Sequence, residues 1–140
     1  MKNILIFLSL LLFYSCGKKY PEIDPDKLSG YWEIQKVHFP DGNEKDFDVN
    51  LTVDHIELKG ETGSRVKVNP NLDGTFTTNG VAEEFVLKFE NDSLRMHYKT
   101  AFDEWTETVL KADDEMLQVK NENEVIYSYR KFQNKNLFEN

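Results

Sequence analysis

Apolar and polar residues alternate in short runs over most of the chain, and this pattern restricts the fold more than any other feature. In residues 84–89, for example, Phe85, Leu87 and Phe89 are spaced two residues apart. Successive side chains of a strand point to opposite faces, so these three would share one face. No long stretch has the period of an amphipathic helix. The alternation therefore predicts half-buried antiparallel strands.

Turn-forming pairs separate these runs at spacings of roughly 8–12 residues, as expected for a β-sandwich or a β-barrel. Asp41-Gly42 and Asp73-Gly74, for instance, supply residues that tolerate positive φ. A closed barrel leaves no exposed edge strands, so a barrel is favoured. We therefore predict one all-β domain over residues 28–132, a small antiparallel up-and-down β-barrel of about eight strands. The expected strands are residues 31–39, 49–58, 64–68, 75–78, 84–89, 94–99, 104–110, 116–119 and 125–132.

Residues 1–15 have the pattern of a bacterial export signal. Lys2 provides the positively charged start, and residues 4–14 form an apolar run that is too short to span a bilayer. The single cysteine of the chain, Cys16, follows directly, and residues 13–16 (Phe-Tyr-Ser-Cys) resemble a lipobox. The resemblance implies cleavage before Cys16, a thioether-linked diacylglycerol and a palmitate-type chain on the new amino terminus. The alternative is a plain secretory signal in which Cys16 is incidental.

Residues 16–27 are predicted to form the lipidated start of the mature protein and a tether. Pro21 and Pro25 disfavour helix in this polar segment, and about eleven extended residues reach roughly 35–40 Å. Several acyl chains would hold the protein permanently, since each buried methylene contributes roughly 0.8 kcal/mol. Because Gly17 follows Cys16 where Asp would indicate the inner membrane, we expect the periplasm-facing leaflet of the outer membrane. Export to the cell surface is the alternative.

Two further segments of the sequence resemble the lipocalins. Ser29-Gly30-Tyr31-Trp32 has the Gly-x-Trp start of the first lipocalin strand, and Arg130 lies in the last predicted strand. The resemblance is to the short lipocalin-like domains of Bacteroidetes lipoproteins. It implies that Gly30, Trp32 and Arg130 form a structural signature, in which the Arg130 guanidinium packs over the Trp32 indole and closes the bottom of the barrel.

The alternation also identifies candidate residues for a ligand cavity. Pockets for apolar ligands are lined mainly by apolar side chains, but small barrels can equally be filled by their own side chains. Each candidate residue therefore has two interpretations, as part of the core or as the wall of a cavity. The candidates are Phe85, Leu87, Phe89, Leu94, Met96, Tyr98, Trp105 and Tyr127.

Charge and residue spacing disfavour several other classes of function. The formal net charge of −8, without a cluster of Lys and Arg, argues against binding to nucleic acid or to an anionic lipid surface. His38, His55 and His97 lie far apart in the sequence, so neither a metal site nor a catalytic centre is indicated. Residues 69–74 echo the start of an EF-hand loop but lack the Glu expected at its end, so we predict a hairpin turn there. No cofactor is expected.

We therefore expect a non-enzymatic, lipid-anchored lipocalin-like barrel of the cell envelope, with a small apolar molecule as its candidate ligand. The alternative is a protein-interaction lipoprotein, an inhibitor or an accessory subunit of an envelope complex, whose barrel is filled by side chains. An enzyme is the third and least favoured class, because it would need convergent buried carboxylates or histidines. Residues 133–140 are assigned to a C-terminal tail.

Overall fold

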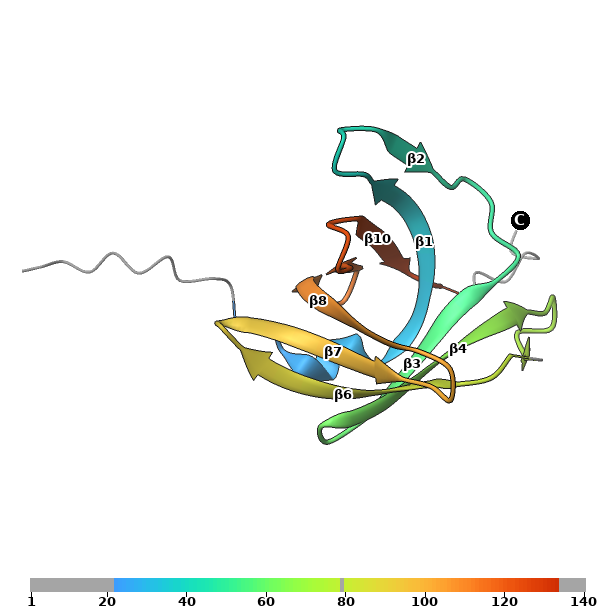
Figure 1. The fold of residues 1–140 in the computed structure, drawn as a ribbon. Helices are drawn as coiled ribbons and strands as arrows, with labels where there is room; N and C mark the ends of the chain where they lie inside the picture. The colour runs from blue at the N-terminus through green and yellow to red at the C-terminus, as the bar shows by residue number, and fades with distance from the viewer. Residues whose placement is uncertain (1–21, 79, 134–140) are drawn as a thin grey trace, which may run out of the picture.

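The computed structural model describes residues 22–78 and 80–133. The predicted signal peptide, Cys16 and most of the predicted tether lie outside the described residues, and so does all but the first residue of the predicted tail. The described residues form one sheet of ten strands and a short 3-10 helix (Figure 1). These elements are η1 (Pro25–Leu28), β1 (Gly30–His38), β2 (Glu44–Asp46), β3 (Val53–Lys59), β4 (Thr62–Pro70), β5 (Phe76–Thr77), β6 (Glu83–Glu90), β7 (Ser93–Lys99), β8 (Glu104–Ala112), β9 (Met116–Lys120) and β10 (Ile126–Lys131).

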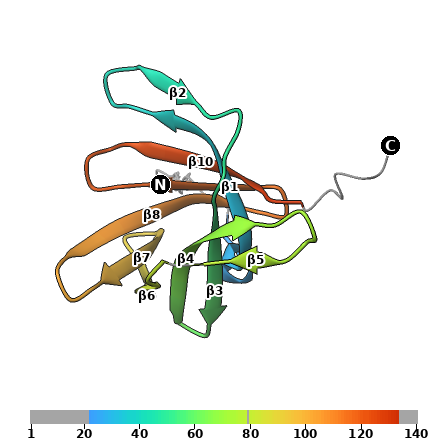
Figure 2. The same ribbon diagram turned by 90° about the vertical axis from the view of Figure 1, so that its right-hand side faces the viewer.

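The sheet closes on itself because β1 pairs antiparallel with β10, the last strand. The order around the barrel is β1, β3, β4, β6, β7, β8, β9 and β10, and every neighbouring pair is antiparallel. Strand β2 pairs with the end of β1, and β5 pairs with the end of β4, so both extend hairpins beyond the barrel wall (Figure 2). The predicted all-β, up-and-down barrel of about eight strands is confirmed.

The strands follow the predicted runs except around residues 44–58. Strand β2 was not predicted, because its three residues are charged and exposed and show no alternation. The predicted strand at residues 49–58 begins later, since Val49 and Leu51 lie in the preceding loop with exposed side chains. Between them, the side-chain amide of Asn50 donates to the backbone carbonyl of Ile34 at 2.9 Å and holds this loop against β1. Apolar residues alone therefore did not locate the strand boundary.

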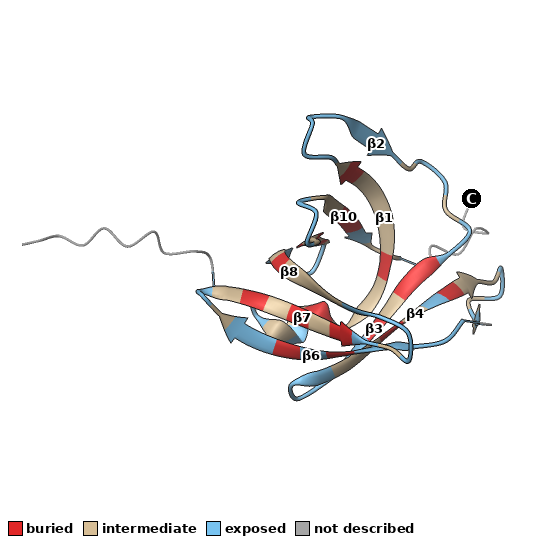
Figure 3. Cartoon of the chain, viewed as in Figure 1, coloured by how far each residue is buried: buried red, intermediate tan, exposed pale blue. Residues whose placement is uncertain are grey.

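Buried residues lie along the barrel strands (Figure 3), and η1 packs against β3 and β8 at one end of the barrel. Asp24 caps η1 by accepting a hydrogen bond from the backbone N–H of Asp26 at 3.0 Å. Leu28, at the end of η1, is fully buried, and its carbonyl accepts a 2.8 Å hydrogen bond from Trp32 Nε1. The buried core cluster comprises Leu28, Trp32, Ile56, Phe85, Leu87, Leu94, Met96, Tyr98, Val109, Leu117, Val119 and Tyr129.

The cation over Trp32 is Lys131, and the prediction that Arg130 would occupy this place is wrong. Lys131 Nζ lies 4.4 Å from the centre of the Trp32 ring and donates to the Ser29 carbonyl at 2.8 Å. Strand register explains the correction. Trp32 lies opposite Lys131 on the inner face, whereas Arg130 lies opposite Glu33 on the outer face, where Arg130 Nε bonds the Glu33 carboxylate at 2.8 Å.

Gly30 makes room for this contact. Its φ of 137° lies in a region that side chains with a Cβ rarely adopt. A Cβ built at this position would also meet the end of the Lys131 side chain. The Gly-x-Trp motif therefore joins a permissive backbone position to the indole on which Lys131 rests, and Gly30 and Trp32 both belong to the closed end of the barrel.

Replacing Lys131 with Met should lower the free energy of unfolding by about 1–3 kcal/mol, because the cation over the indole and the hydrogen bond to Ser29 are both lost. The matched variant is Arg130→Met, which breaks an ion pair with a half-exposed guanidinium and should cost at most about 1 kcal/mol. Urea unfolding followed by tryptophan fluorescence measures both values. An equal or larger loss in the Arg130 variant would contradict the assignment of Lys131 to the closed end.

Candidate functional site

The predicted cavity residues lie mainly in the packed interior of the barrel. Phe85 lies opposite Tyr98 and Leu87 lies opposite Met96, so β6 and β7 bring these side chains onto one inner face. Met96 is fully buried. Five of the predicted residues are buried to a similar degree, and they are Phe85, Leu87, Leu94, Met96 and Tyr98.

The other three predicted cavity residues are less buried. Trp105 stacks on Tyr98 with ring centroids 4.9 Å apart, and Tyr127 packs partly buried against the same core. Phe89 is 64% exposed, so its predicted place inside the barrel is wrong. Strand β4 pairs with β6 only as far as Val86, so the last part of β6 extends past its neighbour and carries Phe89 out of the interior.

A buried arginine, Arg65 on β4, lies at the centre of the barrel interior. One terminal nitrogen, Nη2, lies 2.7 Å from the carboxylate of Asp54 on β3 and 2.7 Å from the hydroxyl of Tyr129 on β10. The other, Nη1, lies 3.1 Å from the Glu107 carboxylate on β8 and 3.3 Å from the Tyr98 hydroxyl on β7. The guanidinium also lies 5.2 Å from the centre of the Tyr129 ring. We call these five residues the Arg65 cluster.

The pKa values of the two carboxylates in the Arg65 cluster are shifted in opposite directions. Burial by itself would raise the pKa of Asp54, but Arg65 and Lys67 outweigh it and hold that pKa below its ordinary value. The Lys67 ammonium reaches in from solvent, with Nζ 2.8 Å from Asp54. At Glu107 burial prevails over the attraction of Arg65 and raises the pKa. Burial also raises the pKa of Tyr129 to about 12, so its hydroxyl is neutral at physiological pH.

The Arg65 cluster ties five strands together across the interior. One guanidinium faces two carboxylates, and the Lys67 ammonium balances the remaining negative charge when both carboxylates are ionised. The sequence analysis missed it. Within residues 64–68 the alternation placed Val66 and Val68 on one side, and such a pattern predicts that the apolar side faces the core. In the barrel Arg65 lies opposite Ile56 on the inner face, so Val66 and Val68 lie on the outer face. Pattern alone cannot identify this reversal.

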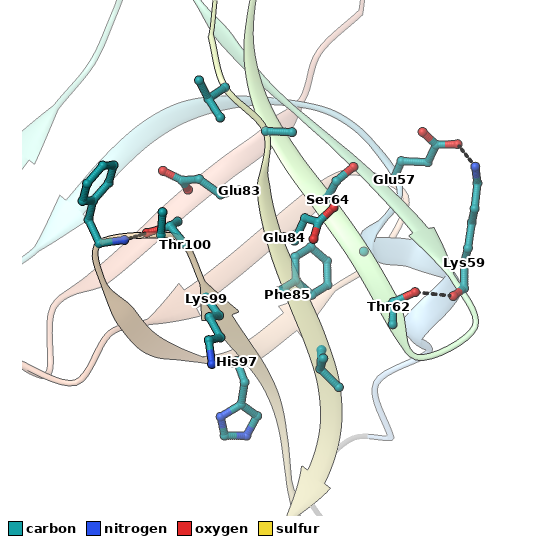
Figure 4. Close-up of a pocket in the computed structure, with 16 residues that line it drawn as sticks. Glu57, Lys59, Thr62, Ser64, Glu83, Glu84, Phe85, His97, Lys99 and Thr100 are labelled. Carbon is teal, nitrogen blue, oxygen red and sulfur yellow. Dashed lines mark hydrogen bonds and ion pairs between the residues drawn. The ribbon is translucent and has the colours of Figure 1, made fainter.

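A groove lies outside the barrel, over the outer face of β4, β6 and β7 (Figure 4). It offers about 1080 Å³ of accessible space and is bounded by the β5–β6 and β7–β8 loops. The first loop contributes Val81 and the second contributes Phe102, both with exposed side chains. Between them the groove has one carboxylate on its floor, at Glu84, and another at its side, at Glu83. We call this feature the β4–β6–β7 groove.

The histidines lie apart in the fold. His38 Nδ1 lies 2.8 Å from Glu44, His55 stacks on Tyr31, and His97 Nε2 lies 3.1 Å from Glu90. Within residues 22–78 and 80–133, no group of three or more His, Cys, Asp or Glu side chains could hold a metal ion. Across the same residues, no helix is long and apolar enough to cross a membrane.

The EF-hand-like segment at residues 69–74 forms the β4–β5 hairpin turn, as predicted. The Asn71 N–H donates to the Thr75 carbonyl at 2.8 Å, and the Gly74 N–H donates to the Asn71 carbonyl at 3.1 Å. The Asp73 carboxylate accepts from the Thr75 N–H at 3.0 Å and from the Thr75 hydroxyl at 2.6 Å. These hydrogen bonds lower the pKa of Asp73, and they engage its carboxylate inside the turn.

The match to a protein family agrees with this architecture. A family model for a lipocalin-like domain matches residues 28–136. A lipocalin-like protein from Bacteroides uniformis is 15% identical with a TM-score of 0.48, and the match covers 76% of this chain and 99% of that one. An uncharacterized protein from Bacteroides eggerthii is 15% identical with a TM-score of 0.46, and that match covers 74% and 98%. No relative was found among curated proteins.

The two buried carboxylates should respond to pH in opposite directions. Asp54, with its lowered pKa, contributes stability that is complete above the ordinary Asp pKa of about 3.9 and is lost as the pH falls through the folded-state value. Glu107, with its raised pKa, contributes stability that is complete below about 4.3 and is lost as the pH rises through the folded-state value.

We therefore expect the cost of Asp54→Asn to be largest near neutral pH and to shrink on acidification, and the cost of Glu107→Gln to be smallest near neutral pH and to grow. Urea unfolding at a series of values between about pH 2.5 and about pH 7 measures both costs against the unmodified protein. If both costs change in the same direction with pH, the assignment of opposite roles in the Arg65 cluster is wrong.

Proposed function

Because the chain belongs to the lipocalin-like domain family, we propose that it is a non-enzymatic binding protein, held in the cell envelope by a lipid on Cys16. Its binding surface lies on the outside of the barrel, and its partner is another envelope protein. In this role it acts as an inhibitor or as an accessory subunit of an envelope complex. The family membership supports a binding role in general, and the packing of the interior supports the choice of the outer surface.

The Arg65 cluster is the observation that carries this proposal. An apolar ligand needs a continuous apolar volume, and such sites hold only a few polar groups. Here a guanidinium, two carboxylates and two tyrosine hydroxyls meet in the middle of the interior. The side chains of the core cluster are buried, and Trp32 and Met96 among them are fully buried. A ligand there would have to break buried ion pairs, which is costly when one partner is left unpaired.

The lipid anchor is proposed from the sequence. An apolar run at residues 4–14 leads directly to the single cysteine of the chain, and Gly17 follows it. The polar segment up to Lys27 is long enough to hold the barrel away from the bilayer, at roughly 3.3–3.6 Å for each extended residue. We place the protein on the periplasm-facing leaflet of the outer membrane, with the cell surface as the other location.

Binding of a small apolar molecule is the second candidate function. It is favoured by Trp105 and Tyr127, which lie opposite the inward-facing residues Tyr98 and Val119 and yet remain partly exposed. These two aromatic side chains could contact a small ligand at the end of the barrel away from η1. Such a ligand would sit above the Arg65 cluster and would not enter the core.

Replacing Cys16 with Ala should abolish metabolic labelling by palmitate and move the protein from the membrane to the soluble envelope fraction, because the acceptor thiol is lost. Ser15→Ala keeps a small residue before the cysteine and should remain membrane-bound and labelled. Fractionation and radiolabelling compare the two variants. Unchanged labelling of the Cys16 variant would show that the anchor has been assigned wrongly.

Native mass spectrometry of the freshly purified protein that starts at residue 17 should give the mass of the polypeptide alone, because the interior is filled. Fluorescent apolar dyes should show no saturable binding, and Trp105→Ala should leave their weak signal unchanged. An apolar molecule that is released only on unfolding, and is lost in the Trp105 variant, would instead establish the ligand-binding function and reject the filled barrel.

A further inference from the structure

Strands and loops of the outer barrel wall form the β4–β6–β7 groove. Outward-facing residues of three neighbouring strands form its floor, and the register sets Thr62, Val86 and His97 side by side across them. Two loops that are separated by about twenty residues of sequence, at Val81 and at Phe102, form its borders. The labelled side chains in Figure 4 show Glu83 and Thr100 on one side of the groove and Glu57 and Lys59 on the other. The floor residues are Thr62, Ser64, Glu84, Val86, His97 and Lys99.

Exposed apolar side chains gather at this groove. Phe102 is 98% exposed, Val81 is 89% exposed and Val86 on the floor is 39% exposed. Single exposed apolar residues are ordinary on a protein surface, but several around one concave surface indicate an interaction site. A phenylalanine whose side chain projects into solvent can bury most of its surface against a partner, as anchor residues of interfaces do.

Hydrogen bonds close the loop that carries Phe102 into a turn. Thr100 Oγ1 accepts from the N–H groups of Phe102 and Asp103 at 3.3 and 3.1 Å, and the Thr100 N–H donates to the Asp103 carbonyl at 2.9 Å. The Phe102 side chain is therefore presented to solvent by a closed turn. Binding would not have to order this loop, and an ordered anchor loses less entropy when a partner binds.

The charges of the groove are uneven. Its two lysines are neutralised, since Lys59 Nζ lies 3.3 Å from Glu57 and Lys99 Nζ lies 3.1 Å from Glu104. Glu83 and Glu84 form no ion pair with any residue in the described part of the chain. Glu84 lies opposite Lys99 in the sheet, but the lining has three carboxylates against two lysines, so the groove is net negative beside apolar side chains, on a protein whose formal net charge is −8. Complementarity requires a ligand with positive charge and apolar groups.

We propose that the β4–β6–β7 groove docks a short cationic and apolar segment of a partner protein, with Phe102 and Val81 packing against its apolar side chains and Glu83 and Glu84 pairing with its Lys or Arg. This inference rests on the proposed function and specifies its binding surface and the chemistry of the partner. An anionic lipid surface and nucleic acid both carry the wrong charge for Glu83 and Glu84.

The test uses the full-length lipidated protein in detergent and three labelled eight-residue probe peptides, in which Lys alternates with Leu, Lys with Ser, or Glu with Leu. Fluorescence anisotropy should show saturable binding of the Lys/Leu peptide alone. Phe102→Ala should weaken that binding about tenfold or more, the effect expected for an interface anchor. Glu83→Gln with Glu84→Gln should weaken it several-fold and reduce its dependence on salt.

The matched control is Val49→Ala with Leu51→Ala, which removes two equally exposed apolar side chains that do not line the groove. This variant should bind the Lys/Leu peptide as the unmodified protein does. The proposal is overturned if no peptide binds, if the control variant loses as much affinity as Phe102→Ala, or if the Glu/Leu peptide binds equally well. Phe102-dependent binding to zwitterionic phosphatidylcholine vesicles, without binding of the Lys/Leu peptide, would make the groove a lipid contact and would also overturn it.

These outcomes are separable from those of the proposed function. Loss of peptide binding together with an empty interior in the native mass spectrum rejects this groove but leaves binding elsewhere on the outer surface. A ligand inside the barrel rejects the proposed function, whatever the peptides do.

Discussion

The ion pair between Arg65 and Asp54 is the interaction on which the arrangement of the barrel interior depends. A guanidinium on the inner face of a strand must find anionic or hydrogen-bonding partners, because leaving it unpaired away from water would cost several kcal/mol. The partners come from four other strands, and one of them, Tyr129, is on the closing strand β10. The register that pairs β1 with β10 therefore also completes the surroundings of Arg65. The same strand register is therefore required to close the barrel and to pair this buried charge.

A second satisfied polar contact lies at the η1 end of the interior. Trp32 donates to the Leu28 carbonyl, and Lys131 rests on the indole and donates to Ser29. Gly30 gives the backbone the conformation that this arrangement needs. Buried apolar side chains of the core cluster surround this end of the interior. A barrel of about eight strands is just wide enough to be filled in this way, so the family's architecture and a packed interior are compatible.

The proposal of a filled barrel moves the question of function to its outer surface. The fold by itself does not specify what a member of a family binds, since binding sites are added to a scaffold mainly through its loops. In this chain the β5–β6 and β7–β8 loops carry exposed apolar side chains on either side of one groove. The strands that flank these loops, β6 and β7, pack their inner faces in the core. The core thus supports the strands that carry the proposed binding surface, and it does not itself contact the partner.

Alternation and turn residues predicted an antiparallel all-β domain and favoured a barrel over a sandwich, and they placed Phe85, Met96 and Tyr98 correctly on its inner face. They could do so because a strand's period of two is a local property of the backbone. Which face of a strand is inner depends instead on its pairing with strands distant in sequence. The tertiary structure was therefore needed to show that Arg65 faces inward and that Lys131, not Arg130, lies over the indole. A shift of one residue in strand register moves every side chain of the strand to the opposite face.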